Sequence, residues 1–459
     1  MINPKDLLSR LRRNPLLAQL NVFRSTTELA AAMHREPFDA QAMQTIPPHM
    51  RLMLAAPDVA VVSKELVKIH FAQQVMLCQG YAQRDPNRPE MVAALRELAE
   101  RVRRGEGITS LPWQTFQAGG CIVEGVTGVG KSFGVDSFFS QLRQVITHRN
   151  VGDCAILQQL VYLRVHMSAD GSRHGFILNA MRAMDEVLGT DYAARYSSHS
   201  WSVERLLVVL LYLFSLHRLG VLIIEEAQER NMAKAHGREF LTFFLRLLNH
   251  GIPVTLVGNP LAFRLIESFS QDAARFSVYG RFRLDPIDSA DSRAWKTDWV
   301  HGLWTPRLTT QPDEYFQLGK DLSLELFLWQ LTGGFPRHLA RLRREAERIA
   351  LLLGREAVTK QDVVAAYTGP EMSGVVRLSE AFVMKDANAL KVFDDVDAGY
   401  YAARWTAATQ KPSPQDKPDA APAPDAKPKG RKTKATPSEV TTEEALAAMR
   451  AALEKQGGQ

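Results

Sequence analysis

The stretch CIVEGVTGVGKSF, residues 121–133, decides the fold. Within it, Gly125–Ser132 follow the pattern G-x-x-x-x-G-K-[ST], directly after an apolar run and before a sequence with helical character, which is the context that this motif requires. The glycines let successive backbone N–H groups point at phosphate oxygens, Lys131 neutralises the β and γ phosphates, and Ser132 offers a hydroxyl to Mg²⁺. The pattern predicts a site for ATP with Mg²⁺. The residues predicted to bind the nucleotide are Gly125, Val126, Thr127, Gly128, Val129, Gly130, Lys131, Ser132 and Phe133.

A second apolar run, Val221–Glu226, ends in two acids and predicts the other half of a nucleotide-hydrolysis site. Glu225 stands where an aspartate is usual, and we expect it to hold Mg²⁺ together with Ser132. Glu226 is expected to polarise the attacking water as a catalytic residue. Because Glu225 is one methylene longer than aspartate, nucleotide binding is predicted to persist while hydrolysis is slow.

Three further residues are candidates for catalysis. Asn259 follows the apolar run Pro253–Val257 and is either a sensor of the γ-phosphate or a turn residue. Arg281 lies in an arginine cluster with Arg275 and Arg283, where an arginine finger could serve a neighbouring subunit, and Arg337 opens a later helix. Each arginine could instead be a surface charge.

The apolar runs from residue 119 onward alternate with stretches long enough for helices, which predicts a parallel sheet with crossover helices, an α/β fold. The flanking sequences are helical. The predicted units are a helical N-terminal region (1–110), the α/β core (111–305), a helical lid (306–375), a C-terminal extension (376–410), a disordered Pro/Lys-rich linker (411–437) and a short docking helix (438–459).

The linker (411–437) and the docking helix (438–459) are predicted from composition and from the spacing of apolar residues. Residues 411–437 contain seven prolines and almost no large apolar side chain, so they cannot repay the entropy of ordering. The basic run 427–434 within them is either a solvated spacer or a contact to phosphates. Leu446, Met449 and Leu453 share one helical face, which fits a docking peptide or a helix that packs on the body.

Composition bounds the remaining possibilities. The 459 residues are 46% hydrophobic and 23% charged, which excludes global disorder, and three widely spaced cysteines exclude a disulfide framework. No membrane span or signal peptide is recognisable, so we expect a cytoplasmic protein that does not enter membranes. The net charge of +6 permits a nucleic-acid partner.

Together these motifs resemble an AAA+ P-loop ATPase, and three further segments resemble the TnsC/TniB class of transposition regulators, relatives of MuB. The segments are Ser168–Ser172, Asp185–Tyr192 and Ile223–Gln228, and the resemblance covers about residues 110–350. It departs from the family at Glu225. The resemblance implies a regulator of DNA transposition that assembles with ATP into a ring or filament of identical subunits on double-stranded DNA, independently of sequence, with ATP hydrolysis timing disassembly.

The same resemblance implies two protein partners, a DDE-type transposase and a TniQ-like target selector. It also places Arg173, Lys234 and Arg238 in loops that could touch DNA phosphates, although a solvated surface would carry the same residues. Two other functions stay open. One is a signalling or defence ATPase that needs no DNA, and the other is a replication-type loader or initiator, for which residues 360–405 are short to form a winged-helix domain.

Overall fold

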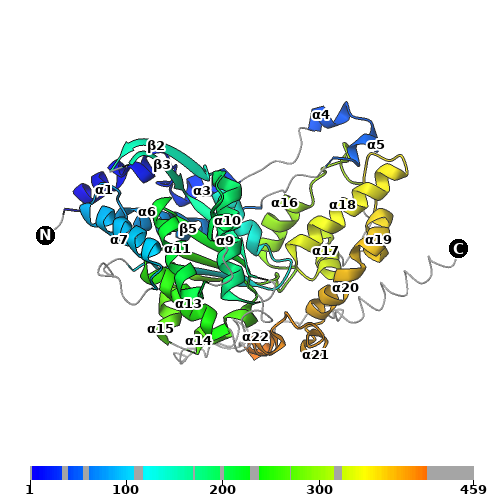
Figure 1. Ribbon diagram of the computed structural model, residues 1–459. Coiled ribbons are helices and arrows are strands. Elements are labelled where there is room, and N and C mark those ends of the chain that lie inside the picture. Colours follow the sequence, from blue (N-terminus) through cyan, green and yellow to red (C-terminus); the bar gives the residue numbers. More distant parts are fainter. Residues whose placement is uncertain are drawn as a thin grey trace, which may run out of the picture.

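The computed structural model describes residues 3–33, 40–54, 61–107, 117–152, 154–168, 171–196, 201–227, 237–268, 270–314 and 323–410. These residues form an α/β core, a helical N-terminal region and a helical lid on one side of the core (Figure 1). The predicted linker (411–437) and docking helix (438–459) lie outside the described residues.

A five-stranded parallel sheet forms the centre of the core. Its strands are β1 (Gly120–Gly125), β4 (Tyr162–His166), β5 (Val221–Ala227), β6 (Val254–Gly258) and β7 (Arg281–Leu284). They lie in the order β4-β5-β6-β1-β7, and each neighbouring pair is parallel. The parallel sheet predicted from four apolar runs is therefore confirmed. Sequence analysis missed β7, an edge strand that carries two arginines and so lacks a continuous apolar run.

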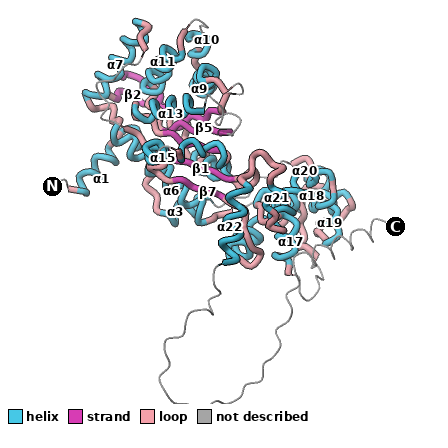
Figure 2. Tube along the Cα trace, turned by 90° about the horizontal axis from the view of Figure 1, so that it is seen from below, coloured by secondary structure: helices cyan, strands magenta, loops and turns pink. Residues whose placement is uncertain are grey.

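Helices cover both faces of the sheet (Figure 2). On one face lie α9 (Arg173–Leu188), α11 (Val203–Leu216) and α13 (Gly237–Asn249), where the ring of Phe176 packs edge-on against Phe244 at 5.4 Å between centroids. On the other face lie α6 (Lys64–Gln83) and α8 (Lys131–Phe139). The buried side chains of His70 on α6 and Ser137 on α8 are hydrogen-bonded at 2.8 Å. These contacts fix α8, and thus the loop before it, on the sheet.

The N-terminal region is helical, as predicted, but its helices divide between two bodies. Those that pack on the core are α1 (Pro4–Arg13), α2 (Pro15–Ala18), α3 (Thr26–Met33), α6 and α7 (Pro89–Arg104). Two short helices, α4 (Ala40–Gln44) and α5 (Pro48–Arg51), lie against the lid instead (Figure 1). Buried Arg51 donates from Nη1 to Glu356 at 2.6 Å and to the carbonyl of Leu308 at 3.2 Å. The N-terminal region therefore spans the core and the lid.

The lid is a bundle around its own apolar cluster. Its elements are the π-helix η2 (Ala294–Val300), α16 (His301–Leu303), α17 (Leu324–Thr332), α18 (Pro336–Leu352), α19 (Lys360–Thr368) and α20 (Pro370–Val383). Trp295, Val300 and Leu303 are buried in this cluster. By packing, the lid therefore begins soon after Leu284, ahead of the boundary predicted at 306, and α20 continues across the boundary predicted at 375.

The remaining elements include a hairpin and several short helices. They are β2 (Val145–Val151), β3 (Cys154–Leu160), α10 (Tyr192–Tyr196), η1 (Pro260–Phe263), α14 (Arg264–Glu267), α15 (Ser270–Phe276), α21 (Ala387–Leu390) and α22 (Ala398–Gln410). The antiparallel hairpin of β2 and β3 was not predicted, because its exposed side reads as polar sequence. Among the helices of the described ranges, none combines the length and apolarity that crossing a bilayer requires.

Candidate functional site

The site is built on the loop between β1 and α8, in the strand, loop and helix order that the motif predicts. Gly128 and Gly130 have φ of 95° and 94°, a left-handed backbone that other residues rarely adopt, so glycine is needed at both positions. Within the loop, Lys131 Nζ donates a hydrogen bond of 2.9 Å to the carbonyl of Val126. The loop thus curls around its own lysine and aims the start of α8 at the space that a phosphate would fill.

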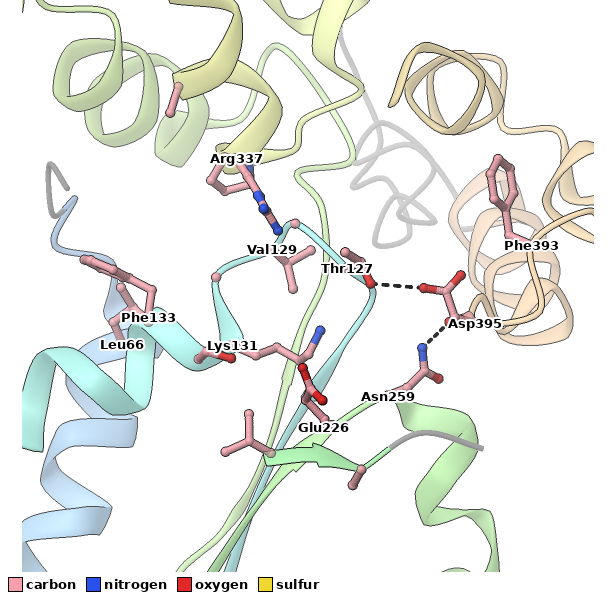
Figure 3. Close-up of a pocket in the computed structure, with 18 of the residues that line it drawn as sticks. Leu66, Thr127, Val129, Lys131, Phe133, Glu226, Asn259, Arg337, Phe393 and Asp395 are labelled. Carbon is pink, nitrogen blue, oxygen red and sulfur yellow. Dashed lines mark hydrogen bonds between the residues drawn. The ribbon is translucent and has the colours of Figure 1, made fainter. Parts of the chain in front are cut away.

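A cavity of about 1370 Å³ opens over this loop (Figure 3). Its polar side is formed by Thr127, Lys131, Ser132, Glu226, Asn259 and Arg337. Its apolar side is formed by Val61, Leu66, Phe133, Trp299, Leu303 and Ala340. A polar end that binds phosphates and an apolar end that binds a planar base are what a nucleotide requires. The predicted nucleotide-binding residues from Thr127 to Phe133 all line this cavity.

The charge of Lys131 is held in a largely buried position. Burial lowers the pKa of its amine to about 8, and the guanidinium of Arg337 acts in the same direction. The carboxylate of Asp395 acts in the opposite direction and raises the pKa of Lys131. A cation that is poorly solvated favours the binding of an anion.

The two acids at the end of β5 face different surroundings. The pairing of β5 with β6 runs regularly to Ile224 and then shifts, so that Ala227 lies opposite Gly258. This bulge places one extra residue in β5, and Glu226 within it has a φ of 57°. Glu226 lines the cavity, where Figure 3 shows it close to Lys131.

Glu225 points toward α8 and β4 and is not among the described residues that line the cavity. Its carboxylate lies 3.8 Å from Arg164 Nε and 3.8 Å from His166 Nδ1. Burial raises the pKa of Glu225, which Arg164 partly offsets and Asp136 reinforces. Its Oε1 atom is buried without a hydrogen-bond partner.

These observations bear on the predicted Mg²⁺ site. The residues present fit a hard cation, since Ser132 and Glu226 line the cavity, and the buried Oε1 of Glu225 accepts no hydrogen bond and faces Arg164 Nε only at 3.8 Å. Within the described residues, no three histidine, cysteine or acidic side chains form a ready metal cluster. A cation here would therefore share its ligands with the nucleotide, which is usual for Mg²⁺.

Asn259 combines the two roles that the sequence left open. Its Oδ1 accepts a hydrogen bond of 2.9 Å from the backbone N–H of Leu261, which caps η1 in the manner of a turn residue. The same side chain lines the cavity, and its Nδ2 donates to the backbone carbonyl of Asp395. The polar tip of β6 therefore reaches the phosphate end.

The two arginines predicted to act in catalysis lie in different places. Arg337 lines the cavity from the first turn of α18, and its backbone N–H donates to the carbonyl of Gly128 at 3.2 Å, so that the lid touches the P-loop. Arg281 lies on β7, where its guanidinium binds Glu124 at 2.8 and 3.0 Å and Glu267 at 2.7 Å. Arg281 is outside the lining of the cavity in its own subunit.

The residues predicted to touch DNA are only partly described. Arg173 begins α9, and its guanidinium forms an ion pair of 2.8 Å with Glu239 of α13. Lys234 and the side chain of Arg238 lie outside the described residues. A phosphate contact through Arg173 would have to compete with Glu239.

Sequence analysis missed the apolar end of the site and one acidic segment. Val61 and Leu66 come from the N-terminal region, Trp299 and Leu303 from the start of the lid, and residues 392–395 from the C-terminal extension. No local motif marks any of them, because they are brought together only by tertiary folding. The sequence feature that could have indicated this end of the site is a tryptophan, Trp299, which follows the last strand.

Comparison with known proteins supports the fold. Residues 114–266 match the protein family described as AAA domain. No curated protein matches the chain. The chain is similar to solved structures of the Aeropyrum pernix ORC2 protein in ADPNP–ADP complexes (13% identity, 71% of this chain and 80% of that chain, TM-score 0.38), the Aeropyrum pernix ORC1 protein in complex with DNA (16%, 81% and 84%, 0.35) and Cdc6p from Pyrobaculum aerophilum (13%, 71% and 82%, 0.36). Over the matched residues the chain thus has the AAA+ P-loop fold, with the strand order and motif described above.

Proposed function

We propose that this protein is an ATP-dependent, DNA-binding regulator of DNA transposition, which assembles as an oligomer on target DNA and recruits a transposase. The observation that supports the ATP-dependent step is the convergence of Lys131, Glu226, Asn259 and Arg337 on one cavity from four separate elements. Such convergence lets a single γ-phosphate contact residues of the sheet and of the lid at the same time. Hydrolysis would then reset the assembly.

Each polar residue of the cavity has a definite task in this proposal. Lys131 neutralises the phosphates, and Ser132 would hold Mg²⁺, which when bound would supply further positive charge beside the phosphates. Glu226 orients the attacking water, while Asn259 fixes its position from the tip of β6. Arg337 connects the γ-phosphate with α18, so that loss of the phosphate loosens the lid. Glu225 is retained as a proposed Mg²⁺ ligand; to bind the cation, its carboxylate would have to turn from Arg164 toward Ser132.

The transposition role rests on the segments that resemble the TnsC/TniB class, and the contacts of one segment explain its pattern. The carboxylate of Asp185 accepts hydrogen bonds from Thr190 Oγ1 and the backbone N–H of Tyr192, both at 2.6 Å. The backbone N–H of Ala193 donates to the same carboxylate at 2.8 Å. This motif therefore ties the end of α9 to α10, which gives the segment a role in the fold.

The partners follow from the same proposal. We expect sequence-independent contacts to duplex DNA, with Arg173, Lys234 and Arg238 as candidate phosphate ligands, and homo-oligomerisation with Arg281 as a candidate arginine finger. To serve a neighbour, the Arg281 guanidinium would have to leave Glu124 and Glu267. A DDE-type transposase and a TniQ-like target selector are the proposed protein partners.

The test is binding of the full chain to a labelled DNA duplex of random sequence, with ATP, a slowly hydrolysed ATP analogue, ADP or no nucleotide, at low and moderate salt. We expect large complexes only with ATP or its analogue, weakening steeply as salt rises. The matched control is Lys131→Ala, which should form none.

Two other outcomes would redirect the assignment. Intact ATP binding with no DNA binding in any nucleotide state would contradict the proposal and favour a signalling ATPase. DNA binding that is specific in sequence, or that yields single-subunit complexes, would favour a replication-type initiator. Among the described residues after the lid, 384–410 form only the helices α21 and α22, without the strands of a winged helix, so the initiator stays the alternative.

A further inference from the structure

A short segment of the C-terminal extension, residues 391–397, lies over the P-loop. It connects α21 to α22, and residues 392–395 line the cavity (Figure 3). The carboxylate Oδ2 of Asp395 accepts a hydrogen bond of 3.0 Å from Thr127 Oγ1. The backbone carbonyl of the same residue accepts one from Asn259 Nδ2. One residue thus binds both the P-loop and the tip of β6.

The Asp395 carboxylate lies at the end of the cavity where positive groups favour a phosphate. Backbone N–H groups at the start of α8 favour an anion, and Lys131 and Arg337 line the same end of the cavity. The negative charge of Asp395 acts on the Lys131 amine across the cavity. An anionic side chain of this protein therefore neutralises part of the charge that the nucleotide phosphates would neutralise.

The segment is anchored at both ends by buried side chains and ion pairs, and its middle carries the contacts of Asp395 to the P-loop and to the tip of β6. On one side, Leu390 and Val396 are buried in the core cluster. On the other side, Asp397 pairs with Arg264 at 3.1 Å, and Asp285 accepts hydrogen bonds from the hydroxyls of Tyr401 at 2.7 Å and Tyr400 at 3.1 Å. Between the anchors, Val392 and Asp395 are exposed, and Val392 has 60% of its surface accessible.

We propose that residues 391–397 form a strap that senses the γ-phosphate: Asp395 and the γ-phosphate compete for Thr127 and Asn259. Two negative groups cannot share this end of the cavity without strong repulsion, so ATP displaces the strap, whereas ADP, which lacks the γ-phosphate, leaves it in place. The helix α22 that follows the strap stays bound to Asp285, so the displacement is confined to the strap itself. This inference rests on the proposed ATP-dependent function and adds its regulation.

The competition is reciprocal by thermodynamic linkage. If ATP weakens the contact between the strap and the P-loop, then a partner that holds the strap away must raise the affinity for ATP by the same factor. ATP binding and release of the strap from the P-loop thus report on the same equilibrium, the one between the bound and the displaced strap.

The experiment compares the affinities of the full-length protein for a slowly hydrolysed ATP analogue and for ADP. Asp395→Asn keeps the shape of the side chain and removes its charge, and we expect the ratio of analogue affinity to ADP affinity to rise by about fivefold or more. Asp272→Asn on α15 is the matched control, since it removes the same charge from a side chain outside the lining of the cavity and outside the strap. We expect its ratio to stay within about twofold of the parent.

A second measurement follows the strap itself. Amide hydrogen exchange across residues 391–397 should be slow with ADP and faster with the ATP analogue in the parent protein, and fast with both nucleotides in Asp395→Asn. An unchanged affinity ratio in Asp395→Asn would overturn the proposal. So would a loss of analogue binding that extra Mg²⁺ restores, because Asp395 would then be a cation ligand. Failure of the parent to bind either nucleotide would instead refute the ATP-dependent function, and the strap proposal with it.

Discussion

The two ends of the nucleotide cavity are built in different ways. The phosphate end is made mainly by one continuous stretch, Thr127–Ser132, whose backbone shape is set by two glycines of positive φ. The apolar end is made by side chains from the N-terminal region and from the start of the lid, more than 200 residues apart in sequence. The first end is a local property of the chain and the second is a product of tertiary packing. We therefore expect a single substitution at the phosphate end to cause a large loss of nucleotide binding, and a single substitution at the apolar end to cause a smaller loss.

The largest effect is expected at the phosphate end. Lys131→Ala should weaken ATP binding by at least about 100-fold, because the buried cavity loses the cation that faces the phosphates. Isothermal titration with the ATP analogue measures this loss. Retained binding would show that Arg337 alone supplies enough positive charge to bind the phosphates. It would contradict the expected difference between the two ends of the cavity.

Substitution of the two acids of β5 tests which of them acts in the cavity. Glu226→Gln should lower the rate of ATP hydrolysis by about 100-fold with little change in nucleotide binding, because the amide cannot polarise water. ATP-dependent assembly should persist and disassembly should slow. The steady-state rate of phosphate release, together with particle size after ATP is depleted, measures both.

Glu225→Gln is the matched control for that experiment. Its carboxylate lies beside Arg164 and His166, outside the cavity lining, so we expect a smaller loss of rate and a higher Mg²⁺ concentration at half-maximal activity. Equal losses in the two variants, with unchanged Mg²⁺ dependence, would contradict separate roles.

The apolar end should respond more weakly. Trp299→Ala removes apolar surface that would cover the base and should weaken binding of ATP and ADP alike, by about tenfold. The equal effect on both nucleotides distinguishes this end from the strap, where the two nucleotides should differ. A thermal melt without nucleotide controls for misfolding, because Trp299 also packs against the apolar cluster of the lid.

The sequence predicts the parts of this molecule that local chemistry determines. The strand, loop and helix order of the P-loop, the parallel strands predicted from apolar runs and a helix beginning next to Arg337 are confirmed, because each depends on residues adjacent in the chain. The orientation of Glu226 could not be predicted. Side chains of a regular strand alternate between its two faces, but a bulge in β5 breaks this alternation and turns Glu226 into the cavity. Edge strand β7 and the strap at 391–397 were missed for a related reason: their roles depend on what they pack against.

A further expected effect is a dependence on pH, and it has opposite signs for binding and for stability. Burial lowers the pKa of Lys131 from 10.5 to about 8 in the folded protein without nucleotide. Between these values the unfolded chain binds a proton that the folded chain has lost, so stability without nucleotide rises with pH across about pH 8 to 10. Over the same range the affinity for ATP falls, because the phosphates bind the charged amine.

Chemical denaturation and ATP titration at pH 7, 8 and 9 should therefore diverge, with affinity falling by a few-fold to about tenfold per unit above pH 8. Lys131→Met, which carries no titrating group, should flatten both profiles. The strap sharpens this test, because the Asp395 carboxylate raises the pKa of Lys131. In Asp395→Asn the fall in affinity should begin at a lower pH than in the parent, whereas a later onset would show that Asp395 does not face the lysine in solution.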